Sequence, residues 1–166
     1  MIVPPPIYKE ERIVLMMALY VLARLDSPNP RKTRVLRFIR RRGFVDLNEG
    51  DFELRSNGEE KWMNDFSWAR ENLKEEGFLE MPEFGIWKLT DSGCRWLLAK
   101  ARLWTQGYEQ DPDTVLEYIN RSHQLNETFL SHILILGRGG DLRKKPNVAE
   151  TLKHAPIEPF DIGSAA

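Results

Sequence analysis

Several features that mark common protein classes are missing from this sequence. Cys94 is the single cysteine among 166 residues, so one chain can form neither a disulfide framework nor a zinc site made of several cysteines. Residues 1–12 lack the basic stretch and apolar core of a secretory signal. The apolar run Ile13–Ala23 has eleven residues, whereas about twenty are needed to span a bilayer. We therefore expect a cytoplasmic protein in a reducing compartment, with no membrane partner.

The chain also has almost no net charge. The formal value is −1 at pH 7, which gives no overall attraction to nucleic acid. The charges are unevenly placed, however: Arg31–Arg42 contains seven basic side chains and no acidic one, whereas Asp46–Asp65 contains seven acidic and two basic ones. A local separation of charge is therefore hidden in the neutral total. The apolar share of 42%, with five Trp and eight Phe, is enough to build a core.

Residues able to carry catalysis or to hold a metal are scarce as well. His123 and His132 stand nine positions apart, without the further ligands that a metal site requires. Ser92 and Cys94 follow Thr90, whose side chain explains this stretch as the start of a helix. The sequence offers no paired-carboxylate site for acid–base chemistry. We therefore predict no catalytic residue, no metal and no cofactor.

A strong helical pattern begins the segment 60–93, the most informative part of the chain. Four apolar residues recur at spacings of four, three and four, which places them on one face of a helix. This helix is predicted over Glu59–Glu76, and Gly77 follows it as a C-terminal cap. The four residues of the stripe are Trp62, Phe66, Ala69 and Leu73.

A hairpin is predicted directly after this helix. Phe78–Met81 and Ile86–Leu89 are rich in residues that suit short strands. Pro82–Gly85 turns the chain between them, and Gly85 can take the positive φ that a tight turn demands. Thr90 then caps a further helix that is predicted to run to about Trp104. Helix, strand, turn, strand and helix form, in this order, the second half of a winged helix-turn-helix.

The other elements complete a mainly α fold with a small β-hairpin. Breaks are predicted at Ser27–Pro30 and at Gln106–Pro112, and Phe44–Gly58 is expected to be a loop with room for one helical turn. Gly43 is expected to cap the helix that is predicted over Arg31–Arg42. The sequence thus predicts a winged helix-turn-helix with extra N- and C-terminal helices. Further helices are predicted over Glu10–Leu25, over Arg31–Arg42, from Pro112 to about His123, and over Glu127–Leu136.

The domain organisation follows from these elements. We expect an extended arm at 1–8, a winged-helix domain at 9–105, a helical extension at 111–137 and a loosely held tail at 138–166, in which Phe160 and Ile162 could dock. The apolar helices over 13–25 and 129–136 exceed what one small winged helix needs. Such faces often meet the same faces of a second copy, so we expect a homodimer through these helices.

The motifs of this segment resemble a known family. The stretch Trp62–Arg70, WMNDFSWAR, is followed by Leu73-Lys74, by Gly77-Phe78-Leu79-Glu80 and by Gly85-Ile86-Trp87-Lys88-Leu89-Thr90 with Gly93. This pattern resembles the N-terminal winged-helix domain of Mrr-type restriction proteins, over roughly residues 9–100. The resemblance implies a winged-helix fold and a role in recognising DNA, in some relatives modified DNA. Two features differ from the family: the hairpin tip carries the acidic Glu83, and we expect no nuclease core after position 104.

Two basic or polar faces are the candidate DNA contacts. Asn in a recognition helix can pair with adenine in the major groove, and an exposed arginine can neutralise a phosphate. On the third helix Trp68 either stacks on a base or covers the second helix and the loop before it. The arginines either bind phosphates or pair with the acidic loop Asp46–Glu60. The candidate DNA-binding residues are Arg31, Lys32, Arg34, Arg37, Arg40, Arg41, Lys61, Asn64, Ser67 and Trp68.

The first functional hypothesis is a non-catalytic DNA-binding protein. It would be a dimeric winged-helix regulator, or a DNA-sensing accessory of a defence or mobile element, whose partner is double-stranded DNA. The alternative is a winged-helix adaptor that binds protein and does not contact DNA. The acidic hairpin tip and the acidic loop motivate this alternative.

Overall fold

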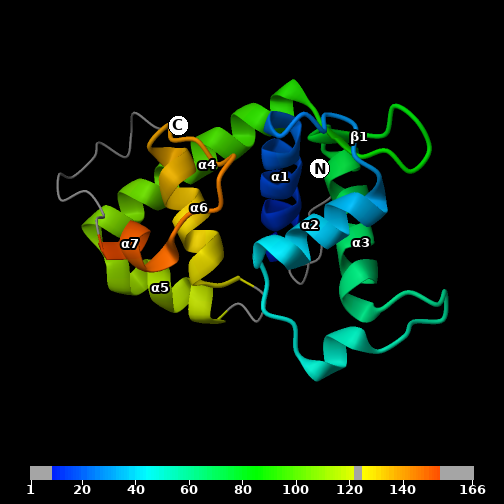
Figure 1. Ribbon diagram of the computed structural model, residues 1–166, viewed down its shortest axis with the longest axis horizontal. Helices are drawn as coiled ribbons and strands as arrows, with labels where there is room; N and C mark the ends of the chain where they lie inside the picture. Colours follow the sequence, from blue (N-terminus) through cyan, green and yellow to red (C-terminus); the bar gives the residue numbers. More distant parts are fainter. Residues whose placement is uncertain (1–8, 122–124, 154–166) are drawn as a thin grey trace.

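A computed structural model describes residues 9–121 and 125–153 (Figure 1). The expected arm at 1–8, the predicted helix end at His123, and Phe160 and Ile162 lie outside the described residues. Helix α1 (Lys9–Arg24) stands at the centre, with α2 and α3 on one side and α4 to α7 largely on the other. Each residue from Ile13 to Leu22 is at most 9% exposed, because neighbouring elements cover this helix on all sides.

The two helices that precede the hairpin of the winged helix are α2 (Lys32–Arg42) and α3 (Lys61–Glu75). Gly43 ends α2 in the left-handed conformation, with a φ of 79°, as its position after the last basic residue predicted. The segment between the two helices contains one turn of 3-10 helix, η2 (Glu49–Phe52). The predicted stripe of α3 is buried, as are three apolar residues of α2. The buried residues are Val35, Leu36 and Ile39 of α2 and Trp62, Phe66, Ala69 and Leu73 of α3.

The hairpin is shorter than predicted because part of it pairs elsewhere. Strands β1 (Leu79–Glu80) and β2 (Lys88–Leu89) form an antiparallel pair. Between them, Gly85 accepts a hydrogen bond from the amide of Lys32 at 3.1 Å, and the amide of Trp87 donates to the carbonyl oxygen of Pro30 at 3.0 Å. The chain before α2 therefore pairs with the hairpin through an isolated antiparallel bridge between Arg31 and Ile86. This pairing fixes the wing, residues 81–87, against the start of α2.

Helix α4 (Asp91–Gln110) begins as predicted but ends later. The hydroxyl of Thr90 accepts a hydrogen bond from the amide of Gly93 at 3.0 Å, which satisfies a free amide of the first turn. A Cβ at Gly93 would lie 2.2 Å from the carbonyl oxygen of Phe78, so only glycine lets α4 approach the hairpin this closely. The predicted break over Gln106–Pro112 is wrong except at its end, because contacts with the C-terminal part hold the last turns of α4. The hydroxyl of Tyr108 donates to the carbonyl oxygen of Leu152 at 3.4 Å, and Glu109 lies 3.6 Å from Arg138, which follows α6.

Three further helices follow: α5 (Pro112–Arg121), α6 (Glu127–Gly137) and α7 (Val148–Lys153). Helix α6 lies along α4, and its residues 129–134 are fully buried. The expectation of a loosely held tail from 138 onward differs from the structure up to Lys153. Leu142 is buried and accepts a hydrogen bond from the guanidinium of Arg42, and α7 follows it.

All these elements share one continuous apolar core. The apolar character of α1 and α6, which motivated the expected dimer, is therefore explained by burial within one chain. Dimerisation stays a prediction that needs another surface. In the described ranges, no helix combines the length and the apolar character that crossing a membrane requires.

Candidate nucleic-acid interface

The outer side of α2, together with the residue that precedes this helix, carries a set of exposed arginines. Five side chains are exposed, and within residues 9–121 and 125–153 none of them forms an ion pair. The acidic loop after α2 therefore does not neutralise them, which was the alternative that the sequence left open. We call these residues the arginine face. They are Arg31, Arg34, Arg37, Arg40 and Arg41.

The two candidate lysines have structural partners instead. Lys32 forms an ion pair with Glu59. The ammonium of Lys61 lies 3.0 Å from a carboxylate oxygen of Asp65 and 3.8 Å from one of Asp51. The hydrogen bond to Asp65 raises the pKa of Lys61. Both lysines thus hold the first turn of α2 or α3 in place, and their charge is compensated.

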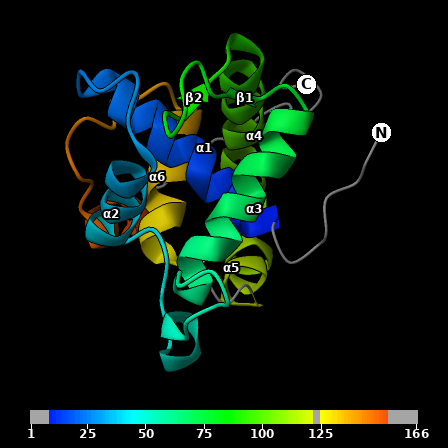
Figure 2. The same ribbon diagram turned by 90° about the vertical axis from the view of Figure 1, so that its right-hand side faces the viewer.

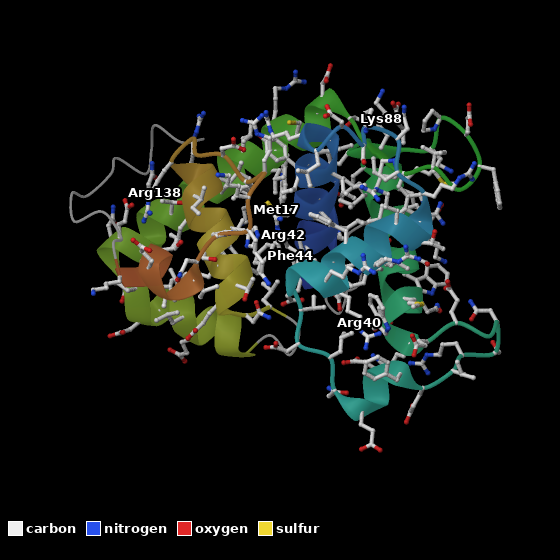
Figure 3. The ribbon with its side chains drawn as sticks, viewed as in Figure 1. Met17, Arg40, Arg42, Phe44, Lys88 and Arg138 are labelled. Atoms are coloured by element: carbon white, nitrogen blue, oxygen red, sulfur yellow. The ribbon has the colours of Figure 1, made fainter. Side chains whose placement is uncertain are left out.

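A groove runs between α2 and α3 below the arginine face. Its volume is about 690 Å³, with Arg37, Arg40 and Arg41 along one side and the apolar Leu36 and Met63 in its lining. We call it the arginine groove. Arg40 packs at the edge of the groove, where its guanidinium carbon lies 5.0 Å from the ring centroid of Phe52. In Figure 3, Arg40 points from α2 toward the segment that contains η2.

A second groove lies between the outer face of α3 and the wing. Its volume is about 910 Å³, and we call it the aromatic groove. Figure 2 shows α3 in front, with α2 beside it and the hairpin at its upper end. Asn64, Ser67 and Trp68 line this groove, as the sequence predicted for a presenting face. Trp68 is 54% exposed, so it does not cover the second helix or the preceding loop.

The aromatic groove carries carboxylates as well as aromatic rings. Glu71 lies 3.2 Å from a guanidinium nitrogen of Arg70, and Arg70 also stands over the ring of Trp87 at 5.8 Å. Arg70 is therefore held by contacts within the fold, and its charge is compensated by Glu71. Glu75 lines the same groove without an ion-pair partner in the described part of the chain.

Sequence reasoning missed an aromatic side chain that is almost fully exposed. Phe84, at the tip of the wing, is 96% exposed and lines the aromatic groove. The sequence shows a phenylalanine in a turn, but only the pairing of residues 85–87 with 30–32 reveals that the turn projects it into solvent. Lys88, on β2, is also exposed beside the wing (Figure 3). Neither residue was among the predicted contacts.

The two grooves meet at one ion pair. Lys32 and Glu59 line both of them. The Lys32–Glu59 ion pair therefore separates two different surfaces. The guanidinium groups of the arginine groove lie on one side of it, and the aromatic rings and hydrogen-bond acceptors of the aromatic groove lie on the other. Over the described residues, no group of three or more His, Cys, Asp or Glu side chains has an arrangement that could hold a metal ion.

Comparison with known proteins finds a family match for part of the chain. Residues 18–99 match the family model of the Mrr N-terminal domain. The match runs from α1 into α4 and includes α2, α3 and the hairpin, so it covers both grooves. It confirms the resemblance that the motifs of residues 60–93 indicated. No curated protein and no solved structure shows significant similarity to the chain.

Proposed function

We propose that this protein is a non-catalytic DNA-binding protein that uses the winged helix to hold double-stranded DNA. An Mrr N-terminal domain suggests a DNA-binding role in restriction-related proteins, and the proposal gives that role to the two grooves of this chain. The observation that carries it is the arginine face, whose five guanidinium groups are exposed and have no carboxylate partner within residues 9–121 and 125–153.

The two surfaces are proposed to have different roles in DNA binding, according to the chemistry of their side chains. Guanidinium groups bind phosphate oxygens in a bidentate manner and stay charged at all physiological pH values. The arginine face would therefore hold the DNA backbone and set its register. Helix α3 would meet the major groove with Asn64, Ser67 and Trp68, because amide and aromatic side chains contact base edges. Lys32 and Lys61 would support the two helices from within and make at most weak contacts.

Fluorescence anisotropy with a labelled random-sequence duplex tests this proposal. We expect micromolar or tighter binding at about 50 mM salt and a steep loss of affinity toward about 200 mM, because phosphate contacts release counterions. The variant Arg34→Glu/Arg37→Glu/Arg41→Glu should lose binding at both salt concentrations. Absence of binding by the wild-type protein at about 50 mM salt would contradict the proposal.

A matched control separates local from global charge effects. Arg102, Lys144 and Lys145 are exposed residues of α4 and of the segment before α7, outside both grooves. Changing these three to Glu alters the net charge by the same amount as the arginine-face variant. The control variant should keep most of the affinity. If both variants lose binding equally, the attraction depends on total charge rather than on the arginine face.

A protein-binding adaptor is the second candidate, and the acidic residues of the aromatic groove favour it. Glu59, Glu71 and Glu75 line this groove and would repel a phosphate backbone placed inside it. The adaptor hypothesis predicts that the arginine-face triple variant still complements a deletion of the gene, that is, it restores the wild-type phenotype. Loss of complementation by a variant that folds normally would count against the adaptor.

A further inference from the structure

The aromatic groove has flat apolar surfaces that face solvent. Trp68 of α3 is 54% exposed and Phe84 of the wing is 96% exposed. Both line the groove together with Met81 and Trp87. Exposed large aromatics are costly to leave uncovered, and they mark binding surfaces more often than isolated aliphatic side chains do. Their position on two different elements gives the groove an aromatic contact on each side.

The polar lining of the groove disfavours phosphate. Its two cationic side chains are already paired: Lys32 with Glu59, and Arg70 with Glu71. Glu75 adds a further carboxylate without an ion-pair partner in the described residues. Asn64 and Ser67 add neutral groups that can both donate and accept hydrogen bonds. The groove therefore offers stacking surfaces and acceptors, without a free positive charge.

This combination suits a nucleobase. Every base has two π-faces, and the exocyclic amino groups of adenine, cytosine and guanine donate hydrogen bonds that carboxylates and amides accept. A base inside a duplex has both faces covered by its neighbours, so Trp68 and Phe84 cannot stack on it. A base that has left the stack can enter a pocket lined by aromatic side chains. The volume of about 910 Å³ is large enough to hold one.

We propose that the aromatic groove binds a nucleobase displaced from the helical stack, while the arginine face holds the neighbouring phosphates. This inference rests on the proposed DNA binding and names its preferred substrate: DNA that contains an unpaired base. The shared wall of the two grooves, Lys32 with Glu59, sets the phosphate surface directly beside the base surface. The carboxylates that argue against a phosphate in the aromatic groove become acceptors for the base.

Binding to two matched oligonucleotides tests the inference with the full-length chain. One is an intact duplex, and the other is the same duplex with one extra unpaired 2-aminopurine. Stacking of a base on an aromatic side chain contributes enough to change affinity by roughly 10-fold. We therefore expect the bulged duplex to bind roughly 10-fold more tightly, with a fall in 2-aminopurine fluorescence on binding.

The variants Trp68→Ala and Phe84→Ala should remove this preference. Both side chains are exposed, so the fold should tolerate their loss. For Phe84→Ala, affinity for the intact duplex should stay within about 2-fold of wild type, because phosphate contacts supply most of it. Leu54→Ala is the matched control, since Leu54 is 72% exposed but lies outside the aromatic groove; it should keep the preference.

The outcomes distinguish this inference from the proposed function. Equal affinity for the two duplexes overturns the displaced-base site and leaves the DNA-binding proposal standing. Binding to neither duplex overturns both. A lysine-rich peptide is the competing ligand, because a cation can also sit on aromatic faces beside carboxylates. Trp68-dependent binding of such a peptide, with no preference for the bulge, would assign the groove to a basic protein segment instead.

Discussion

Arg42 of α2 and His132 of α6 are joined by a buried hydrogen bond. The Nε–H of Arg42 donates to Nε2 of His132 at 3.1 Å, and Nδ1 of His132 lies 2.6 Å from the carbonyl oxygen of Thr128. A ring that accepts at Nε2 and donates at Nδ1 is the neutral imidazole. The guanidinium also reaches the carbonyl oxygen of Leu142. In Figure 3, Arg42 and Phe44 occupy the space between α2 and the C-terminal helices, so this contact ties the arginine face to the rest of the fold.

The first prediction concerns stability at low pH. Burial lowers the pKa of His132 from 6.5 to about 4, and the charge of Arg42 acts in the same direction. Between these two pH values the unfolded chain binds a proton that the folded chain does not, so acidification through this window destabilises the fold. The contribution of His132 should fall by up to about 3 kcal/mol between pH 7 and pH 4. Urea unfolding at several pH values measures it.

His132→Gln provides the comparison for this prediction. An amide can accept from Arg42 and donate to Thr128, but it does not titrate. The wild-type protein should lose stability relative to this variant as the pH falls from about 7 to about 4. A constant difference between the two proteins across this range would show that His132 is not held neutral.

A second buried group gives the opposite pH dependence. Glu11 on α1 is 1% exposed, and neither of its carboxylate oxygens has a hydrogen-bond partner among the described residues. Burial raises the pKa of Glu11 from 4.5 to about 8. The folded chain therefore keeps a proton that the unfolded chain has released above pH 4.5, and stability falls as the pH rises from 4.5 to 8. This contribution amounts to up to about 5 kcal/mol.

Glu11→Gln should remove that cost without changing the shape of the side chain. We expect the variant to be more stable than the wild-type protein at pH 8 and to have no such advantage at pH 4.5. Thermal or urea unfolding at the two pH values decides the matter. An advantage of equal size at both would point to better packing rather than to ionisation.

The parts of the fold that sequence predicts well depend on local chemistry. The stripe of α3, from Trp62 to Leu73, is buried because a period near 3.6 places its residues on one face. Thr90 and Gly43 act as caps because their roles need only the neighbouring backbone. By contrast, the end of α4 depends on α6: the hydroxyl of Thr105 lies 3.3 Å from the carbonyl oxygen of Ile133. Local propensity at the glycine- and glutamine-containing stretch 106–110 cannot report such a contact.

The candidate site likewise has features that local sequence predicts and features that depend on long-range contacts. The helical period correctly predicts that Arg34, Arg37 and Trp68 point away from the core. It cannot predict which charges find a partner, because Lys32 meets Glu59 across 27 positions of sequence. The exposure of Phe84 likewise depends on the pairing of the wing with residues 30–32. Long-range contacts therefore decide which members of a predicted face are free to bind a ligand.

The third prediction concerns how the affinity for DNA depends on salt concentration. Single substitutions in the arginine face should each reduce this dependence by a fixed amount. Each bound phosphate contributes about −0.9 to the slope of log affinity against log salt concentration. Replacing Arg34 or Arg37 by Ala should make the slope less negative by about 0.9, because one phosphate is then no longer neutralised. Replacing the exposed Arg102 of α4 should leave the slope unchanged. Anisotropy titrations at four or more salt concentrations measure it, and an unchanged slope in Arg34→Ala and Arg37→Ala would remove these residues from the interface.

The fourth prediction tests the close approach of α4 and α6. Gly137 ends α6 against α4, where an added Cβ would lie 2.0 Å from the hydroxyl of Thr105 and 2.5 Å from the carbonyl oxygen of Ala101. The second contact is with backbone, which no side-chain rotation can relieve. Gly137→Ala should therefore separate the two helices and destabilise the protein by about 1–3 kcal/mol, measured by urea unfolding.

Gly107→Ala is the matched control for this contact. Gly107 lies inside α4, and a Cβ there would meet only Cγ2 of Val115, at an ordinary distance of 3.8 Å. Alanine restricts the unfolded chain more than glycine does, so this change should stabilise the protein by about 0.5–1 kcal/mol. The same substitution thus acts in opposite directions at two positions because only one of them has neighbouring atoms in the way. Stabilisation by both changes would mean that α6 does not approach α4 as closely as the positions of Thr105 and Ala101 require.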